Sequence, residues 1–254
     1  MEAGMKPAVF PRQDERTLAD DGDRLHFCST CAFSQACLDE GMDKGGLRDL
    51  HMLVEHIGRF HAGDHLFREG DPFEAIAAVR AGRVKTYSID REGREHVLGF
   101  HLPGEVIGLN AIAGNKYPCN AIALDTVTLC RFSFPQISVL ATRLPGVQQT
   151  LFRLLSRDIG TASLLAGDWT ADERMAAFLV GLSRRLAARG FSPDRFQLTM
   201  ARTDIANYLR LAPETVSRVL KRFQDEGMLQ VERRELELLD RSRLESMAGG
   251  ILPS

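Results

Sequence analysis

The chain has 254 residues, of which 44% are hydrophobic and 26% are charged, as in a soluble globular protein of roughly one to three domains. Its net charge is −2, so any surface for nucleic acid must be local. No run approaches the ~18 apolar residues of a membrane span, and acidic residues interrupt the N-terminal stretch, so we expect a cytoplasmic protein with no membrane partner.

Residues 1–25 are polar and lack a clear period, which predicts a flexible arm. The next segment, residues 26–57, contains three closely spaced cysteines, Cys28, Cys31 and Cys37. It ends in a short stretch that is predicted to be helical from its apolar residues, which are Leu47, Leu50, Leu53, Val54 and Ile57.

The three clustered cysteines predict a soft-metal site, because thiolates suit iron–sulfur clusters and zinc. A structural zinc site usually has two C-x2-C pairs or a Cys/His pairing. A second pair is absent, and the spacing of the nearby His26 suits a loop better than a shared tetrahedron. A cubane cluster needs four cysteines, and the fourth could be Cys119, in a predicted loop, or Cys130, in an apolar strand-like run. Either could instead be a buried thiol, and the residues alone leave this choice open.

Residues 58–144 are predicted to form an antiparallel β domain. Glycines recur at intervals of 7–12 residues between positions 63 and 104, with short apolar or alternating runs between them. Such evenly spaced turn signals are typical of an antiparallel barrel or sandwich. Asp90-Arg91-Glu92-Gly93 is predicted to be a hairpin turn in which the glycine supplies a positive φ.

Residues 145–169 have helical periodicity. Apolar residues recur at spacings of three and four, including Leu155, Ile159, Ala162 and Ala166. The helix could be buried against its own domain or form a dimer seam. We favour the seam, because a long helix between two domains has little else on which to pack.

Residues 170–254 have the pattern of a winged helix-turn-helix. A helix over Glu173–Ala188 is followed by two short helices, Thr203–Leu209 and Pro213–Gln224, and by a weakly alternating stretch typical of a wing, Leu229–Leu239. The predicted inner faces are formed by Ile205, Ala206, Leu209, Val216, Leu220 and Phe223.

The outward face of the second short helix carries polar residues at positions i, i+3, i+4 and i+7, namely Glu214, Ser217, Arg218 and Lys221. Arginine can bind guanine and glutamate can accept from cytosine in the major groove. Lys221, Arg222 and Arg202 are interpreted as phosphate contacts. The alternative is an ordinary solvated helix, but the flanking elements favour DNA binding.

Several stretches carry a resemblance to a known family: Gly99-Phe100-His101-Leu102-Pro103-Gly104, Glu173-Arg174-Met175-Ala176-Ala177-Phe178, Leu182-Ser183-Arg184-Arg185, Arg189-Gly190-Phe191-Ser192-Pro193 and Glu214-Thr215-Val216-Ser217-Arg218. From about residue 26 to residue 248 the chain resembles the oxygen-responsive FNR type of the cyclic-AMP-receptor-like (CRP/FNR) regulator superfamily. The resemblance implies an α+β fold with an N-terminal Cys-rich loop, an antiparallel β-roll sensor domain, a long dimerisation helix and a C-terminal winged helix-turn-helix.

The resemblance also implies a function. Members bind DNA as [4Fe-4S]-loaded homodimers when oxygen is scarce, and oxygen degrades the cluster. Cys28, Cys31, Cys37 and Cys130 match the ligands, which leaves Cys119 as an extra cysteine. Glu214, Ser217 and Arg218 match the trio that reads palindromes of the TTGAT-N4-ATCAA kind, and Asp90, Arg91, Glu92 and Gly93 match a surface presented to RNA polymerase.

The chain departs from the family pattern in one region. Between Ile159 and Glu173 it is about three residues shorter, and Ala162 stands where an acidic residue that tunes dimerisation is expected. Easier dimerisation is the expected consequence, since like charges across a seam oppose association.

Other functions remain as alternatives. The same fold could respond to a cyclic nucleotide, haem or NO, although residues 114–120 contain no Arg-Ser or Arg-Thr pair. The cysteines could instead hold a structural zinc. We expect no enzyme and no small-molecule substrate, because the seven histidines are scattered and no Ser/His/Asp, HExxH or P-loop arrangement occurs.

Overall fold

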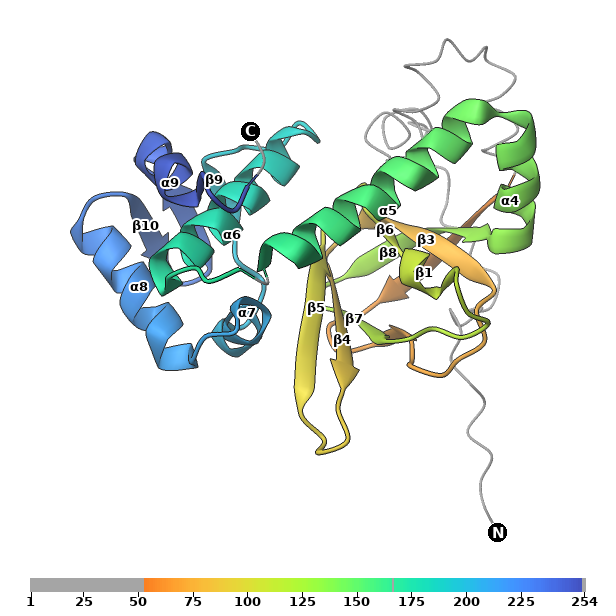
Figure 1. The fold of residues 1–254 in the computed structure, drawn as a ribbon, viewed down its shortest axis with the longest axis horizontal. Coiled ribbons are helices and arrows are strands. Elements are labelled where there is room, and N and C mark those ends of the chain that lie inside the picture. Colours follow the sequence, from red (N-terminus) through yellow and green to blue (C-terminus); the bar gives the residue numbers. More distant parts are fainter. Residues whose placement is uncertain (1–52, 166, 253–254) are drawn as a thin grey trace. The chain divides into compact units, whose positions relative to one another are not determined.

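The computed structural model describes residues 53–165 and 167–252, and residues 160–165 by their backbone alone. These residues form two compact units, one mainly of residues up to Ser156 and the other mainly of residues from Arg157 onward (Figure 1). The first unit contains the predicted sensor domain, and the second contains the predicted helix-turn-helix.

The first unit contains two four-stranded sheets, as the evenly spaced turns predicted. One sheet has the order β1-β8-β3-β6 and the other the order β2-β7-β4-β5. The elements are β1 (Val54–Phe60), β2 (His65–Phe67), β3 (Ala75–Ala81), β4 (Val84–Ile89), β5 (Glu95–His101), β6 (Val106–Ile107), the 3-10 helix η1 (Leu109–Ala111), β7 (Asn120–Ala123), β8 (Val127–Ser133), α4 (Phe134–Arg143) and the start of α5 (Pro145–Leu165).

Alternation along the strands divides this unit into two cores. In β8, Val127 and Leu129 belong to the core that both sheets share, whereas Cys130 and Phe132 belong to a second core with α4 and α5. Successive side chains of a strand point to opposite faces, so adjacent residues of β8 enter different cores. Each large apolar side chain that is fully buried in this way contributes about 1.5–3 kcal/mol to folding.

The stretch that was predicted to be helical up to Ile57 is a strand from Val54 onward, so that part of the prediction was wrong. Val54 pairs with Phe132 of β8, and His56 pairs with Cys130. A register shift at the bulge between Ile57 and Phe60 lets both side chains contact the inner core. Pairing with β8 therefore overrides the helical spacing of the apolar residues.

The hairpin between β4 and β5 was predicted correctly. Gly93 has a φ of +79°, and its N–H donates to the Asp90 carbonyl oxygen over 3.0 Å. The Asp90 carboxylate also accepts from the backbone N–H groups of Glu92 and Arg94, each over 2.9 Å. Asp90 thus holds the turn that presents its neighbours to solvent.

In the residues that the structure describes, the second unit contains the end of α5, four further helices and a three-stranded sheet of order β10-β11-β9. Its elements are α6 (Ala171–Ala187), β9 (Arg195–Gln197), α7 (Arg202–Leu209), α8 (Pro213–Asp225), β10 (Leu229–Glu232), β11 (Glu235–Leu238) and α9 (Arg241–Ala248). The helix α6 begins two residues before its predicted start. Thr170 caps it, and the side chains of Thr170 and Glu173 form a reciprocal capping box.

The helix α5 ends at Leu165, whereas the sequence predicted helix as far as residue 169. Its inner side, which includes Val147 and Leu154, packs on the core with α4. Across the described parts of the chain, no helix combines the length and the apolar character that crossing a membrane requires.

Candidate functional site

The helices α7 and α8 form the predicted helix-turn-helix. All six residues assigned to the inner faces are buried, and Val219 joins them. Leu211 closes the turn by donating its N–H to the Ala206 carbonyl oxygen over 2.9 Å. Arg210 adopts a left-handed φ of +56° in this turn, a conformation that costs a non-glycine residue roughly 1–2 kcal/mol. The strong segregation of apolar residues fixes which side of α8 faces solvent.

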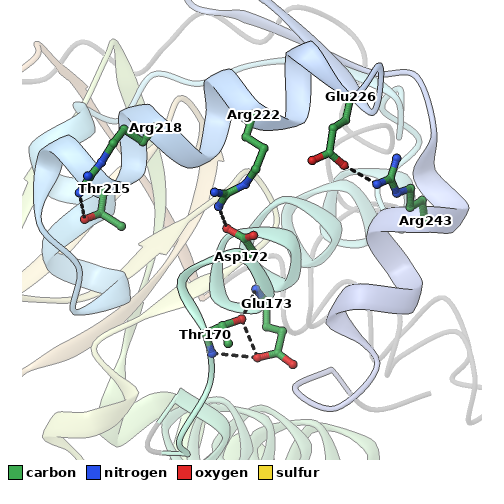
Figure 2. Close-up of polar contacts among 8 residues, drawn as sticks. All are labelled: Thr170, Asp172, Glu173, Thr215, Arg218, Arg222, Glu226 and Arg243. Carbon is green, nitrogen blue, oxygen red and sulfur yellow. Dashed lines mark hydrogen bonds and ion pairs between the residues drawn. The ribbon is translucent and has the colours of Figure 1, made fainter.

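That solvent-facing side carries the four polar residues predicted for it. Glu214, Ser217, Arg218 and Lys221 are all exposed. Arg218 donates from Nη2 to Thr215 Oγ1 over 3.3 Å, one turn back along the helix (Figure 2). A guanidinium has five N–H donors, so Arg218 retains the paired donors that a guanine edge requires.

The two other predicted phosphate contacts have different surroundings. Arg222 forms an ion pair with Asp172 of α6, as Figure 2 shows. Arg202 is partly buried at the start of α7, and its Nη1 has no hydrogen-bond partner in the described part of the chain. This burial lowers the pKa of Arg202. A buried N–H without an acceptor costs free energy, which an approaching anion would relieve.

The tip of the wing is basic, which the sequence analysis did not single out. Arg233 and Arg234 lie in the turn between β10 and β11, and both are exposed. The N–H of Leu198 donates to the carbonyl oxygen of Arg234 over 2.7 Å and ties the turn to the unit. The sequence did contain a signal for this tip, because the two adjacent arginines stand between two alternating, strand-like runs. Exposed arginines at such a turn are suited to binding phosphate oxygens of DNA.

In the first unit, Cys130 is the candidate ligand that the structure describes, whereas Cys28, Cys31 and Cys37 lie outside the described residues. Cys130 is half-buried on β8, and its Sγ lies 3.5 Å from Nδ1 of His56 on β1. Between residues 53 and 252, excluding 166, no group of three or more His, Cys, Asp or Glu side chains could hold a metal ion. Any metal site that includes Cys130 would therefore need ligands from outside these residues.

Cys119 is in a different environment. Its side chain is 0% exposed in the core between the two sheets, and Asn110 donates from Nδ2 to its Sγ over 3.3 Å. Burial raises the pKa of the Cys119 thiol. A protonated, enclosed thiol is a poor metal ligand, because the thiolate is the form that binds.

The Cys130 thiol would fit a cluster shared with the N-terminal cysteines, to judge by its position in the sheet and by the length of the connecting segment. Cys37 lies 17 positions before Val54, and Val54 pairs with Phe132, two residues from Cys130. A residue spans at most about 3.3–3.6 Å, so a connection of this length is long enough to return to the β1–β8 edge. Thiolate is also the ligand type that iron–sulfur clusters use.

A thiol-reactivity experiment checks the contrast between the two cysteines. In native metal-free protein at pH 8, we expect iodoacetamide to modify Cys130 while Cys119 stays unmodified until a denaturant is added. The raised pKa of Cys119 keeps the thiolate scarce and burial blocks access. Peptide mass spectrometry over time gives both rates, and equal rates would contradict the assignment of Cys119 to the core.

The predicted dimer seam is exposed in part. Ile159 is 68% exposed, and Phe152, which the sequence analysis did not select, is 61% exposed. These two residues are seven positions apart and share one side of α5. Leu155 is instead half-buried against the core of its own unit. Side-chain surroundings at Ala162 and Ala166 lie outside the described residues.

The predicted polymerase surface lies at the tip of the hairpin between β4 and β5. Arg91, Glu92 and Gly93 are exposed, whereas Asp90 is turned inward to hold the loop. Glu92 pairs with Arg94 through a 2.5 Å contact between Oε2 and Nη2. Arg91 and Glu92 are therefore the side chains best placed to meet a partner.

Comparisons with known proteins cover both units. A family model described as a cyclic nucleotide-binding domain matches residues 57–143, and one described as a Crp-like helix-turn-helix domain matches residues 173–247. A solved structure of FixK2 from Bradyrhizobium japonicum superposes with a TM-score of 0.69 at 29% identity, covering 76% of this chain and 96% of that one. These matches agree with the predicted fold class.

Two curated relatives share most of their length with this chain. The transcriptional activator protein Anr of Pseudomonas aeruginosa is 42% identical over 228 residues, which are 89% of this chain and 93% of that protein. The fumarate and nitrate reduction regulatory protein of Escherichia coli K12 is 38% identical over 237 residues, 92% of this chain and 94% of that protein. The chain therefore belongs to the FNR type of the CRP/FNR superfamily, whose members are DNA-binding transcriptional regulators rather than enzymes.

Proposed function

We propose that this protein is an oxygen-sensing transcriptional regulator that binds palindromic DNA as a [4Fe-4S]-loaded homodimer and controls anaerobic gene expression. The observation that carries the proposal is the contrast between the two cysteines of the sensor unit. The reachable thiol, Cys130, lies beside the strand into which the cysteine-rich segment leads, and the other thiol is enclosed in the core.

Cys28, Cys31, Cys37 and Cys130 would hold the cluster, which supplies a centre that oxygen degrades. His56 lies within hydrogen-bond distance of the Cys130 sulfur, so it would help to orient that ligand. On α5, the exposed pair Phe152 and Ile159 supports a seam with a second copy, because exposed apolar side chains on one side of a helix are typical of protein–protein contacts.

Target recognition would rest on α8. Glu214, Ser217 and Arg218 would read base edges of a TTGAT-N4-ATCAA-like palindrome, and a twofold dimer would place two such helices about one helical turn apart. Lys221, Arg222 and Arg202 would bind phosphates, which adds salt-dependent affinity without sequence preference. Arg91 and Glu92, on the hairpin held by Asp90 and Gly93, would face RNA polymerase.

A cyclic nucleotide as the effector is less well supported. Tyr117 and Cys119 lie in the segment where such a ligand would need an arginine and a hydroxyl group. Both side chains are enclosed in the core instead, where Tyr117 stacks on Phe67 with ring centroids 4.1 Å apart. These residues strengthen the packing of the two sheets.

The test uses full-length protein purified without oxygen. We expect about four iron and four sulfide per chain, the molar mass of a dimer by light scattering, and preference for the palindrome over a scrambled duplex by fluorescence anisotropy. Exposure to air should remove the iron and sulfide, reduce the molar mass and weaken palindrome binding together. Metal-free protein that dimerises and binds the palindrome as well as the loaded form would overturn the sensing proposal.

A further inference from the structure

Arg222 and Asp172 form a cation–anion pair within the DNA-binding unit, and the two residues are 50 positions apart in sequence on different helices (Figure 2). Asp172 lies in the first turn of α6, whose N-terminus is fixed by the Thr170–Glu173 capping box. Arg222 lies in the last turn of α8. The Asp172 side chain is 32% exposed and the Arg222 side chain is 49% exposed, so the pair is at the surface, open to solvent and to competing anions.

The neighbouring cation provides a contrast. Lys221 is also exposed and basic, but no acidic group lies within ion-pair distance of it in the described part of the chain. A second arginine pair near the end of the helix, Arg243 with Glu226, has the same chemistry but places its cation on α9 (Figure 2). Of the cations assigned to DNA phosphates on α8, Arg222 is thus the one that must leave a carboxylate.

We propose that Asp172 is an intramolecular competitor for DNA phosphate, and that Arg222 exchanges the Asp172 carboxylate for a phosphate oxygen when α8 binds DNA. The inference rests on the proposed docking of α8 against DNA and adds a residue that sets its strength. Carboxylate and phosphate present similar oxygen acceptors to a guanidinium, so one can replace the other. A surface ion pair is weak enough to break on contact, and it therefore tunes affinity without blocking it.

The exchange of carboxylate for phosphate at Arg222 affects the affinity for DNA but not the preference for a sequence. A phosphate contact adds affinity on every sequence, so a competitor for it lowers binding to operator and random DNA by the same factor. Weaker binding to random DNA leaves fewer copies of a regulator on the large excess of non-specific sites. Asp172 would thus weaken sequence-independent binding, while Glu214, Ser217 and Arg218 would still discriminate between base sequences.

The experiment compares Asp172→Asn with wild type in full-length protein, by titrating a palindromic and a random duplex over a range of salt concentrations. We expect Asp172→Asn to tighten binding to both duplexes by about two- to fivefold per subunit, the range that corresponds to one exposed ion pair. Arg222→Ala should weaken binding to both and reduce the salt slope by about 0.9 per subunit. Thermal melting identifies any variant that loses affinity by unfolding.

The double variant and a matched control isolate the mechanism. In the Arg222→Ala background, Asp172→Asn should change affinity no more than Asp225→Asn does, because Asp225 is an exposed carboxylate on α8 and both changes then report only the removal of one negative charge. Weaker binding by Asp172→Asn would overturn the proposal, since Asp172 would then position Arg222 for DNA. An undiminished effect without Arg222 would also overturn it. A wild-type protein with no preference for the palindrome would refute the proposed function instead, while random-duplex titrations still test the exchange.

Discussion

Replacing Cys130 by serine will abolish iron and sulfide loading of the anaerobic protein, whereas replacing Cys119 will leave loading unchanged. A hydroxyl group is a poor ligand for a site built on soft thiolates, and losing one of four ligands would open the proposed cluster. Cys119 cannot substitute, because its side chain is enclosed between the sheets and its thiol has a raised pKa. Iron and sulfide assays and the visible absorbance of each variant give the result.

The control for Cys119 must allow for stability. A buried hydroxyl costs roughly 1–3 kcal/mol where it is poorly bonded, although Asn110 can still donate to serine at this position. Cys119→Ala provides a second variant without a polar atom, and melting temperatures separate unfolding from loss of loading. Iron content that falls for a folded Cys119 variant and persists for Cys130→Ser would reverse the ligand assignment.

The choice between these cysteines shows where sequence reasoning stops. Considered alone, the apolar run around Cys130 suggested burial, and the proline before Cys119 suggested an accessible loop. Strand alternation gives the opposite result: Leu129 enters the core between the sheets, so Cys130 faces the other side. Cys119 precedes β7 by one residue and is carried into the core with it. The family resemblance selected Cys130 without this geometry.

Local and long-range determinants explain the remaining successes and failures. The inner face of α8 was predictable because Val216, Leu220 and Phe223 repeat with the helical period, and that period is a local property. The conformation of strand β1 was not predictable, because its partner residues in β8 lie 67–78 positions away, from Phe60 with Val127 to Val54 with Phe132, and provide the hydrogen bonds that decide it. The Asp172–Arg222 pair was missed for the same reason, since no local pattern links α6 to α8.

Replacing Arg218 by alanine will produce the largest loss of DNA discrimination. A bidentate contact to guanine contributes about 1–3 kcal/mol at each half-site, so a dimer on a palindrome would lose roughly twice that preference. Arg218 is exposed on the outer side of α8, and its contact with Thr215 Oγ1 leaves donors for a base edge. Competition titrations with the palindrome and a duplex altered at the guanine of each half-site measure the difference.

Two variants separate base reading from charge. Arg218→Lys keeps the positive charge but loses the planar fork, so it should lose nearly as much discrimination as alanine while keeping the salt slope. Lys221→Ala should weaken binding to every duplex by one factor, and lower the slope by about 0.9 per subunit, with the preference for the palindrome intact. If Arg218→Ala weakens binding to random DNA as strongly as to the palindrome, Arg218 binds only phosphate. Base recognition would then depend on Glu214 and Ser217, because they are the two other residues of α8 that are proposed to read base edges.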